Sequence, residues 1–399
     1  MTVSTSDVAV VLTALVAFLF YTVTRSTSKA AAPVQVRDTN NVLNGAVTDA
    51  ARERYIFQEK DEAAVRAKLE AGAVKVSKLM VYPIKSCRGT SMSEAKYSPT
   101  GLENDRKWCI IDPNNNKIIT ARAIPKMVLV TPTILQDGDD PCGGRLEVSF
   151  PADSGCESFS VPLRPTPDML DKWKRIEDLS VHSFIDIDGC ITEPHPSLVG
   201  ADRDLCSRTL SKFLGRTVHL VYKGPRPRPS PPAWSDPAMT ANVYYHDAWP
   251  LLVVSSESLE AVKSLVKEWC QKRSDDDDFR KWDADSIVIE RFRPNIIFTG
   301  AGRPFPEDRW KEIDITATNA SETGSFTLVS KCTRCMLPNI DPSTGIRNPA
   351  IPSKPLQVFR IGVDPSNMGD SCFGCNAVAA GYGTLRVGDV ISVKAWGVV

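Results

Sequence analysis

The sequence SFTLVSKCTRCMLPNIDPSTG, residues 325–345, joins a strand-like run to two closely spaced thiols. Ser325 to Val329 is typical of a β-strand, and a proline and a DPSTG turn follow the second thiol. Cys332 and Cys335 flank Arg334, and a guanidinium beside a thiol favours its thiolate form. Because an ionised sulfur is a soft metal ligand or a nucleophile, this segment predicts metal or sulfur chemistry at a strand end.

The composition indicates an ordinary folded protein. The chain has 399 residues, of which 42% are hydrophobic and 24% charged, and this length favours two domains with appendages. Its 48 basic side chains balance 48 acidic ones, so we expect no nucleic-acid partner. The 11 cysteines are odd in number and spread along the chain, which favours a reducing compartment over a disulfide scaffold.

An apolar run near the N-terminus predicts a membrane anchor. Val8 to Val23 reads VAVVLTALVAFLFYTV, an uncharged stretch near the short limit for a spanning helix. Asp7 precedes it in place of a basic residue, which disfavours a secretory signal. Arg25 and Lys29 follow, so the positive-inside rule places the rest of the chain in the cytosol. We expect a signal anchor at 1–25, in the mitochondrial outer membrane or the endoplasmic reticulum; a hydrophobic tail without topological meaning is the alternative.

The rest of the chain predicts an α+β fold that is mostly β. Residues 26–73 are expected to form a linker with a short helix. Apolar runs bounded by turn residues begin at residue 74, and we divide them into domains at 74–190 and 191–399. The expected elements are helices at 59–71, 201–214 and 257–271, and strands at 74–84, 107–111, 117–120, 127–135, 145–150, 181–187, 218–222, 250–254, 287–291, 296–298 and, as a pair around a Gly-Asp turn, 385–393.

The cysteines allow three interpretations from their spacing alone. Cys332-x2-Cys335 and Cys372-x2-Cys375 have the spacing of a structural zinc ribbon. The second interpretation treats most of the thiols as buried apolar residues; this is our default for Cys87, Cys109, Cys142, Cys156, Cys190, Cys206 and Cys270. In the third, one thiolate ligates a larger cofactor whose anionic parts are bound by polar and basic residues at strand ends, namely Lys85-Ser86, Asp105-Arg106, Arg293-Pro294-Asn295 and Arg334.

Two further features stay open. The proline-rich stretch GPRPRPSPPAWSDP, residues 224–237, is either an extended surface loop or a rim where Arg226 and Arg228 meet an anionic ligand. The four histidines form no recognisable acid–base group, and His246 beside Asp247 is a weak candidate for proton transfer.

Taken together, several segments resemble the MOSC family, the molybdenum-cofactor-binding domain of cofactor sulfurases, and within it the mitochondrial amidoxime-reducing components. The resemblance covers roughly residues 74 to 398 and follows the order usual in the family. It rests on the segments VYPIKSCRG (81–89), GLENDRKWCIID (101–112), ITARAIPKMVLV (119–130), RFRPNIIF (291–298), KCTRCMLPNIDPSTG (331–345), FGCNAVAAG (373–381) and LRVGDVISV (385–393).

The resemblance implies a fold and an activity. The fold would be a MOSC-type β-barrel body with an N-terminal β-rich MOSC-associated domain and a single N-terminal membrane anchor helix. The activity would be molybdenum cofactor-dependent reduction of N-hydroxylated compounds, such as amidoximes and hydroxylamines, with electrons from cytochrome b5 and NADH-cytochrome b5 reductase. The alternative is a molybdenum cofactor carrier or sulfuration module without reductase activity. Pyridoxal phosphate binding is a further association of the family, but we expect no pyridoxal-phosphate sulfurase domain before residue 74.

The resemblance also assigns roles to residues. Cys335 matches the cysteine that binds molybdenum, and is the implied catalytic and metal-binding residue. The residues that match cofactor contacts are Lys85, Ser86, Arg106, Arg293, Asn295, Thr333 and Arg334. The chain departs from the family at Ala248 and Trp249, where relatives have hydroxyl residues, and at Asn376, where animal relatives have an aromatic residue.

Overall fold

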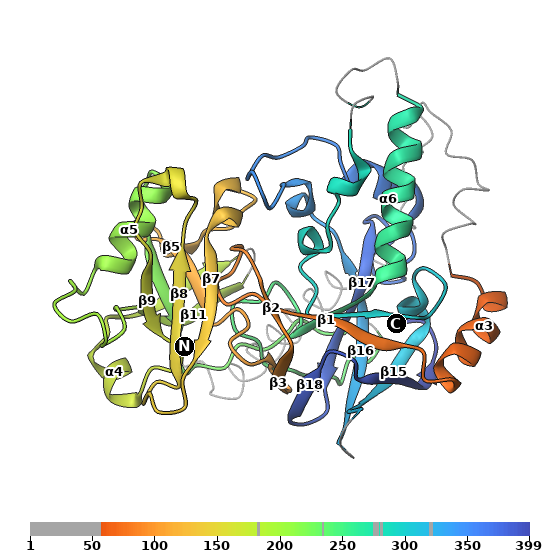
Figure 1. Ribbon diagram of the computed structural model, residues 1–399, viewed down its shortest axis with the longest axis horizontal. Helices are drawn as coiled ribbons and strands as arrows, with labels where there is room; N and C mark the ends of the chain where they lie inside the picture. Colours follow the sequence, from red (N-terminus) through yellow and green to blue (C-terminus); the bar gives the residue numbers. More distant parts are fainter. Residues whose placement is uncertain (1–56, 182–183, 234, 274–278, 280–281, 319–321) are drawn as a thin grey trace, which may run out of the picture. The chain divides into compact units, whose positions relative to one another are not determined.

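The computed structural model describes residues 57–181, 184–233, 235–273, 279, 282–318 and 322–399 (Figure 1). All of these belong to the unit Val47–Val399. The expected anchor at Val8–Val23 and most of the expected linker lie outside the described residues. Within the described residues, no helix is both long and apolar enough to cross a bilayer.

The larger sheet has eight strands in the order β14-β13-β17-β16-β15-β19-β1-β2. An additional pairing of β14 with β1 closes seven of them into a ring. Its strands are β1 (Lys75–Val81), β2 (Thr90–Met92), β13 (Leu251–Ser255), β14 (Ile296–Thr299), β15 (Trp310–Thr316), β16 (Thr323–Thr333), β17 (Cys372–Ala379) and β19 (Val390–Trp396). Buried aliphatic and aromatic side chains from these strands form the larger hydrophobic core, which drives closure of the sheet.

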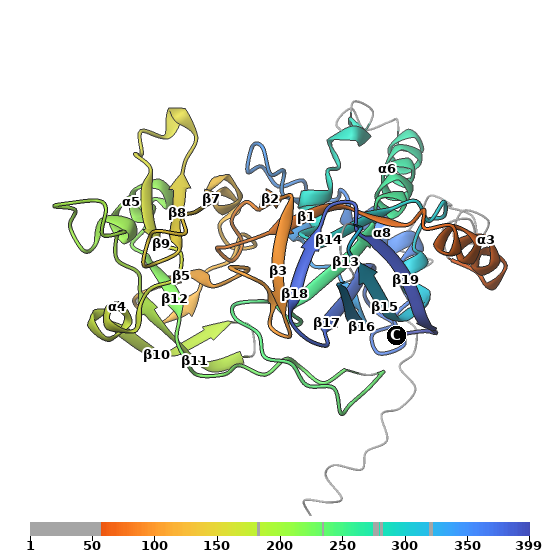
Figure 2. The same cartoon turned by 60° about the horizontal axis from the view of Figure 1, so that its bottom comes forward.

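A smaller closed barrel contains five strands in the order β10-β11-β12-β5-β6, and lies beside the larger one in Figures 1 and 2. Its strands are β5 (Trp108–Asp112), β6 (Lys117–Ile118), β10 (Arg175–Val181), β11 (Phe184–Ile191) and β12 (His219–Lys223). Two three-stranded sheets accompany the barrels: β7 (Thr131–Gln136), β8 (Gly144–Ser149) and β9 (Phe159–Pro162) form one, and β3 (Glu94–Ser98), β4 (Gly101–Leu102) and β18 (Gly383–Arg386) form the other.

The helices are short and lie outside the sheets. The α-helices are α3 (Glu59–Glu70), α4 (Pro167–Lys172), α5 (Leu205–Leu214), α6 (Ser256–Gln271) and α8 (Ser353–Phe359). The 3-10 turns are η2 (Pro125–Leu129), η3 (Ala152–Ser154), η4 (Ala284–Ser286), η5 (Ile289–Phe292), η6 (Pro306–Arg309) and η7 (Leu337–Asn339). The start of α6 is fixed by its cap, because Ser258 N donates a 3.0 Å hydrogen bond to Ser255 Oγ.

The strand β1 connects the two parts of the fold. It precedes the smaller barrel in the sequence, yet it pairs with β14 and β19 of the larger one. The chain then leaves β1, passes through β2, β3 and β4, and reaches the smaller barrel at β5. This route brings the VYPIKS and DRK segments to the mouth of the larger barrel.

The mostly β architecture predicted from the sequence is confirmed, including the hairpin of β5 and β6 around the DPNNN turn. Four expected elements were wrong in detail. Residues 287–291 were expected as a strand, but Arg291 N bonds back to Val288 O and the chain turns as η5. The strand expected at 127–135 starts with η2, and residues 181–187 span the end of β10 and the start of β11. The tail strands do not pair with each other, because β18 pairs with β3 and β19 with β15.

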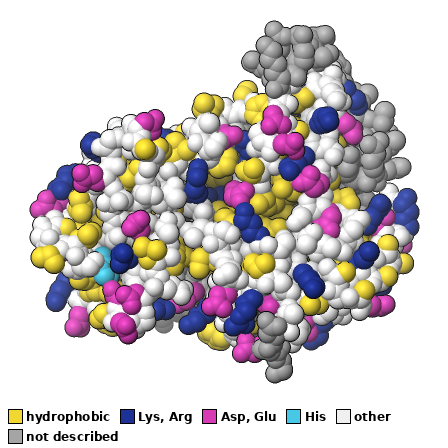
Figure 3. All heavy atoms as spheres, viewed as in Figure 1, with side chains coloured by type: hydrophobic (Ala, Val, Ile, Leu, Met, Phe, Trp, Pro, Cys, Tyr) yellow, Lys and Arg dark blue, Asp and Glu magenta, His cyan; other side chains and the backbone are white. Residues whose placement is uncertain are grey.

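The domain division at residue 190 stays a prediction. The strand pairing groups the elements differently, because β12 lies beyond that point and pairs with β5 and β11 of the smaller barrel. Basic and acidic side chains are interspersed on the face shown in Figure 3, in keeping with the balanced charge of the sequence.

Candidate functional site

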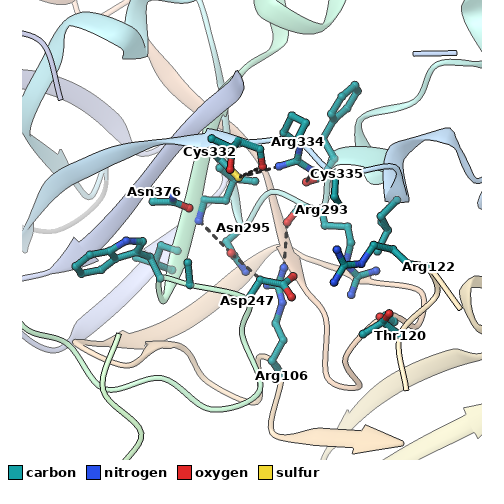
Figure 4. A pocket seen from close by; sticks show the side chains of 18 residues that line it. Arg106, Thr120, Arg122, Asp247, Arg293, Asn295, Cys332, Arg334, Cys335 and Asn376 are labelled. Carbon is teal, nitrogen blue, oxygen red and sulfur yellow. Dashed lines mark hydrogen bonds between the residues drawn. The ribbon is translucent and has the colours of Figure 1, made fainter. Parts of the chain in front are cut away.

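A cavity of about 270 Å³ lies at the mouth of the larger barrel (Figure 4). Its walls come from the start of β13, the residue before β14, the end of β16, and the loops that flank β5 and β6. Its charged lining residues are four arginines and one aspartate, namely Arg106, Arg122, Arg293, Arg334 and Asp247. The cavity therefore carries excess positive charge, and an anionic ligand would complement it.

Three non-glycine residues on the cavity wall have left-handed backbone conformations. Ser86, Arg106 and Arg293 have φ angles of 69°, 50° and 60°. Each such residue costs of order 1–3 kcal/mol and persists where the surrounding structure holds it. Backbone hydrogen bonds hold two of them, since Arg106 N donates to Tyr82 O at 2.8 Å and Arg293 N to Glu290 O at 3.2 Å. Asn104, Asn116, Asp186 and Phe305 have the same conformation away from the cavity wall, so the strain supports a functional site here only together with the charges described next.

The guanidinium of Arg106 is fixed by contacts on several sides. Its Nη2 donates to Arg293 O at 3.1 Å, its Nη1 donates to Asn295 Oδ1 at 3.3 Å, and it forms an ion pair with buried Asp105. Its Cζ lies 4.5 Å from the centre of the Tyr82 ring, and Arg293 Cζ lies 4.3 Å from the same centre. Asn295 and Tyr82 thus position two cationic groups toward one cavity.

Among the residues that the structure describes, none supplies Arg293 with a carboxylate partner in an ion pair. Its Nη1 donates to Cys87 O at 2.6 Å, but its Nη2 is buried and has no hydrogen-bond partner within that part of the chain. Burial and the neighbouring charge of Arg106 lower the pKa of Arg293 to about 10. An anion bound in the cavity would accept a hydrogen bond from Arg293 Nη2. It would also reduce the repulsion between the guanidinium groups of Arg106 and Arg293.

Asp105 and His246 support the cavity from behind. His246 Nε2 lies 3.0 Å from Asp105 Oδ2, and Tyr82 N donates to Asp105 Oδ1 at 2.7 Å. Burial raises the pKa of Asp105, but the Arg106 charge and the bond to His246 outweigh it, so the net pKa is low. Burial also lowers the pKa of His246, against the opposing effect of Asp105. His246 is 3% exposed and does not line the cavity, so its proton-transfer role finds no support in its position.

Lys85 lies behind the cavity wall. Its Nζ donates to Tyr245 O at 2.7 Å and to Asp247 Oδ1 at 2.8 Å, and the side chain of Asp247 is 73% exposed and lines the cavity. Arg228 Nη1 donates to the backbone oxygens of residues 244 and 246, which fixes the segment that carries Asp247. Arg228 therefore supports the site from within, and Arg226 pairs with Asp186. The anion-binding rim considered for the proline-rich loop stays a prediction.

The two thiols within residues 325–345 differ in their surroundings. Cys335 is exposed and lines the cavity, whereas Cys332 is half-buried and accepts a 2.9 Å hydrogen bond from Arg334 Nη1. Arg334 Nη2 donates to Phe292 O at 2.9 Å. The sequence suggested that Arg334 stabilises a thiolate, and the structure directs that guanidinium to Cys332, leaving Cys335 open to the cavity.

The zinc ribbon considered from the cysteine spacing is wrong. Cys372 and Cys375 are fully buried, and Cys375 Sγ lies 3.2 Å from Glu307 O. Burial raises the pKa of Cys372 to about 12 and raises that of Cys375 well above its ordinary value. Among the described residues, the four sulfurs of the two pairs form no group that could hold one metal ion.

The cavity brings together most of the residues that the resemblance selected. Those on its wall are Ser86, Arg106, Arg293, Asn295, Thr333, Arg334 and Cys335; Lys85 is absent from the wall and reaches it through Asp247. Their roles toward a cofactor stay predictions. The departures Ala248, Trp249 and Asn376 also line the cavity.

Sequence reasoning missed Thr120, Arg122 and the cavity-lining position of Asp247. Thr120 and Arg122 lie two and four residues after the end of β6, and polar residues in a loop after a short strand are the signal that could have identified them. The site as a whole offers an open thiol beside several guanidinium groups. Such a set suits a ligand that combines a thiophilic metal with an anionic arm.

Comparisons with known proteins show which proteins this chain is similar to. Residues 73–188 match the MOSC N-terminal beta barrel domain, and residues 240–392 match the MOSC domain. The chain is 30% identical over 329 residues to mitochondrial amidoxime-reducing component 1 of Mus musculus, covering 79% of this chain and 81% of the relative. It is 28% identical to the Homo sapiens protein of the same name, covering 79% and 82%. Among solved structures, YUAD protein from Bacillus subtilis matches 80% of this chain and 93% of its own, with 10% identity and a TM-score of 0.29.

Proposed function

The chain belongs to the MOSC-domain family, and on that premise we propose that it is a molybdenum cofactor-dependent reductase of N-hydroxylated compounds. The observation that carries the proposal is the position of Cys335, an exposed thiol on a cavity wall that also carries four arginines. A thiolate ligates molybdenum as a soft donor, and guanidinium groups bind phosphate and pterin oxygens. When bound, the cofactor supplies the two-electron redox couple of molybdenum.

Different residues of the chain would bind different parts of the cofactor. Cys335 Sγ would hold the metal, and Arg106, Arg293 and Arg334 would bind the anionic end of the cofactor. Asn295 acts on the protein side, because it accepts from Arg106 and donates to Met80 O at 3.2 Å. These contacts support a rigid cradle that loses little entropy on binding.

The substrate step needs electrons and protons in balance. An amidoxime takes up two electrons and two protons, its N–O bond breaks, and the products are an amidine and water. The exposed carboxylate of Asp247 is our candidate for proton delivery, since it lines the cavity and Lys85 holds it in place. The electrons would come from NADH through cytochrome b5 and its reductase.

The location of the enzyme is part of the same proposal. The apolar run Val8–Val23 would anchor it to the mitochondrial outer membrane, with the endoplasmic reticulum as the alternative, and the cavity would face the cytosol. The named mitochondrial relatives support this location. The comparisons give no support to pyridoxal phosphate binding, so it is not part of the proposal.

Metal analysis combined with turnover tests this function. We expect about one molybdenum per chain in protein produced with a cofactor supply, and reduction of benzamidoxime by NADH when cytochrome b5 and its reductase are added. Full molybdenum loading without reduction would favour the carrier or sulfuration module. Protein that takes up no molybdopterin would contradict both the reductase and the carrier or sulfuration module.

A further inference from the structure

A second group of metal-ligand side chains lies away from the cavity, beside the sheet of β7, β8 and β9. Asp140 and Cys142 come from the loop between β7 and β8, and His195 follows β11. Their ligand atoms all lie within 4.8 Å of one another. No other group of this kind is present among the residues that the structure describes. None of the three side chains lines the candidate functional site.

The group is built into the fold. Cys142 is 3% exposed and His195 is 4% exposed, while the side chain of Asp140 is 18% exposed. Cys142 N donates a 2.6 Å hydrogen bond to Asp140 Oδ1, which fixes that carboxylate and leaves Oδ2 facing the histidine. His195 N donates to Ser160 O at 2.8 Å, so β9 holds the histidine backbone. The donors are therefore positioned before any ion arrives.

The ring of His195 supplies the second observation. Its Nε2 lies 3.0 Å from Asp140 Oδ2 but makes no hydrogen bond of normal geometry, and it is buried. A buried polar nitrogen whose contact has poor geometry is incompletely satisfied, and a metal ion would take up its lone pair. Its Nδ1 lies 2.8 Å from Ser197 Oγ, which can accept the Nδ1 proton when Nε2 gives its lone pair to a metal.

An ion-free alternative exists for the same atoms. Ser197 N also lies 3.2 Å from His195 Nδ1, which fits the tautomer with its proton on Nε2 toward Asp140. In that state the Cys142 thiol keeps a weak contact with Met169 Sδ at 3.7 Å and lies beside the Asp140 carboxylate. A bound cation would engage the carboxylate, the thiolate and the imidazole at once.

We propose that Asp140, Cys142 and His195 form a site for a zinc-type divalent cation, with water in the fourth position. Mixed nitrogen, sulfur and carboxylate ligands in tetrahedral arrangement suit Zn²⁺, and the two anionic ligands neutralise its charge. Binding would release the proton of the Cys142 thiol to solvent. The ion would join the β7–β8 loop to the segment after β11 and would stabilise this part of the fold.

Metal content measures the site directly. The full chain, stripped with a chelator, is dialysed against Zn²⁺ and then against metal-free buffer in a Cys335→Ser background, which removes the exposed thiol of the cavity. We expect about one zinc per chain, and a loss of about tenfold or more in bound zinc for Cys142→Ser and for His195→Gln. Cys156→Ser, at a half-buried thiol outside the group, should retain the ion.

Cobalt provides a readout that does not depend on stability. Co²⁺ bound at the site should give a thiolate charge-transfer band that Cys142→Ser removes and Asp140→Asn retains in weaker form. If Cys142→Ser fails to fold, the His195→Gln variant and the cobalt band decide. The proposal is overturned if the stripped parent binds no zinc, or if both variants bind as much as the parent.

Discussion

Arg106 Nη2 donates a 3.1 Å hydrogen bond to Arg293 O, and the two guanidinium groups lie over one Tyr82 ring. The fold thus holds two cations together at a cavity, and of the two arginines it is Arg106 that forms an ion pair with Asp105. Such an arrangement costs free energy in the protein without a bound anion. Binding of an anion recovers that free energy.

Replacing Arg293 with glutamine should weaken cofactor binding without loss of fold stability. The pKa of Arg293 is lowered to about 10 by burial and by Arg106. Its charge therefore destabilises the folded protein at neutral pH when no anion is bound. Glutamine removes that charge and keeps a donor for Cys87 O. We expect the molybdenum content to fall about tenfold or more, since a hydrogen bond to a charged group contributes about 1.5–3 kcal/mol.

The matched control is Arg145→Gln, at an exposed arginine of β8. It should change neither the metal content nor the melting temperature of the apoprotein. If Arg293→Gln retained full molybdenum, the anion cradle would be assigned to the wrong residues.

Cys335→Ser should abolish reduction, whereas Cys372→Ser should not. The first removes the only cysteine sulfur among the described residues that is exposed, and it lies on the cavity wall. The second places a hydroxyl in a fully buried position, which should cost stability of about 1–3 kcal/mol and leave the cavity intact. Turnover per bound molybdenum, with melting temperature alongside, distinguishes these effects. Equal and severe loss of folding in both variants would indicate a shared structural metal.

The sequence predicts those features of the site that depend on neighbouring residues, and not those that depend on contacts between distant segments. The β-rich fold and the thiol segment are local patterns, and both are confirmed as structure. Arg334 illustrates the limit: it is adjacent to Cys335 in the sequence and two residues from Cys332, yet the tertiary structure directs its guanidinium to Cys332. Lys85 illustrates the same limit, because Asp247, to which its Nζ donates, is 162 residues away in the sequence.

The fold errors have the same origin. Residues 287–291 begin with three β-branched residues, as a strand often does, but Arg291 Nη2 donates to Asp341 Oδ2 at 2.6 Å, and that long-range pair accompanies the turn η5. The Gly-Asp turn at 388–389 was read as a hairpin. Asp389 Oδ2 instead accepts from Arg386 N at 2.7 Å, and the chain crosses from one sheet to another.

Asp247→Asn should lower turnover with little change in bound molybdenum. The carboxylate lines the cavity, and we propose that it delivers protons to the substrate. General acid catalysis contributes about 10²–10⁴-fold, so kcat should fall within that range and its pH profile should lose one ionisation. Lys85 would lose its ion-pair partner, so turnover is expressed per bound molybdenum to separate this loss of stability. An unchanged kcat would remove Asp247 from the mechanism.

Asn376→Phe should narrow the range of substrates. Asn376 is in β17, lines the cavity, and donates from Nδ2 to Ser330 Oγ at 3.0 Å. A phenyl ring would occupy part of the cavity of about 270 Å³ and leave the Ser330 hydroxyl without this bond. We expect KM to rise for bulky N-hydroxylated compounds and to change little for hydroxylamine itself, as measured by steady-state kinetics. A parallel rise for both would indicate a loss of structure and not a change in cavity size.

Glu307→Gln should remove part of the loss of stability that the protein suffers as pH rises. Burial and the charge of Asp308 raise the pKa of Glu307 to about 8, and Ser258 Oγ donates to its Oε1 at 3.1 Å. The folded state therefore binds this proton more tightly than the unfolded state does. Its stabilising effect is fully present below the unfolded pKa, and is lost as pH rises toward about 8, by at most about 1.4 kcal/mol per pH unit.

Denaturant unfolding of parent and variant at a series of pH values measures this effect. The stability of Glu307→Gln relative to the parent should increase between about pH 5 and pH 8 and then level off. The control Glu312→Gln, at an exposed position of β15, should follow the parent at every pH. A constant difference between Glu307→Gln and the parent across this range would show that Glu307 is already ionised in the folded protein, and that its contacts with Ser255 and Ser258 stabilise the charged form.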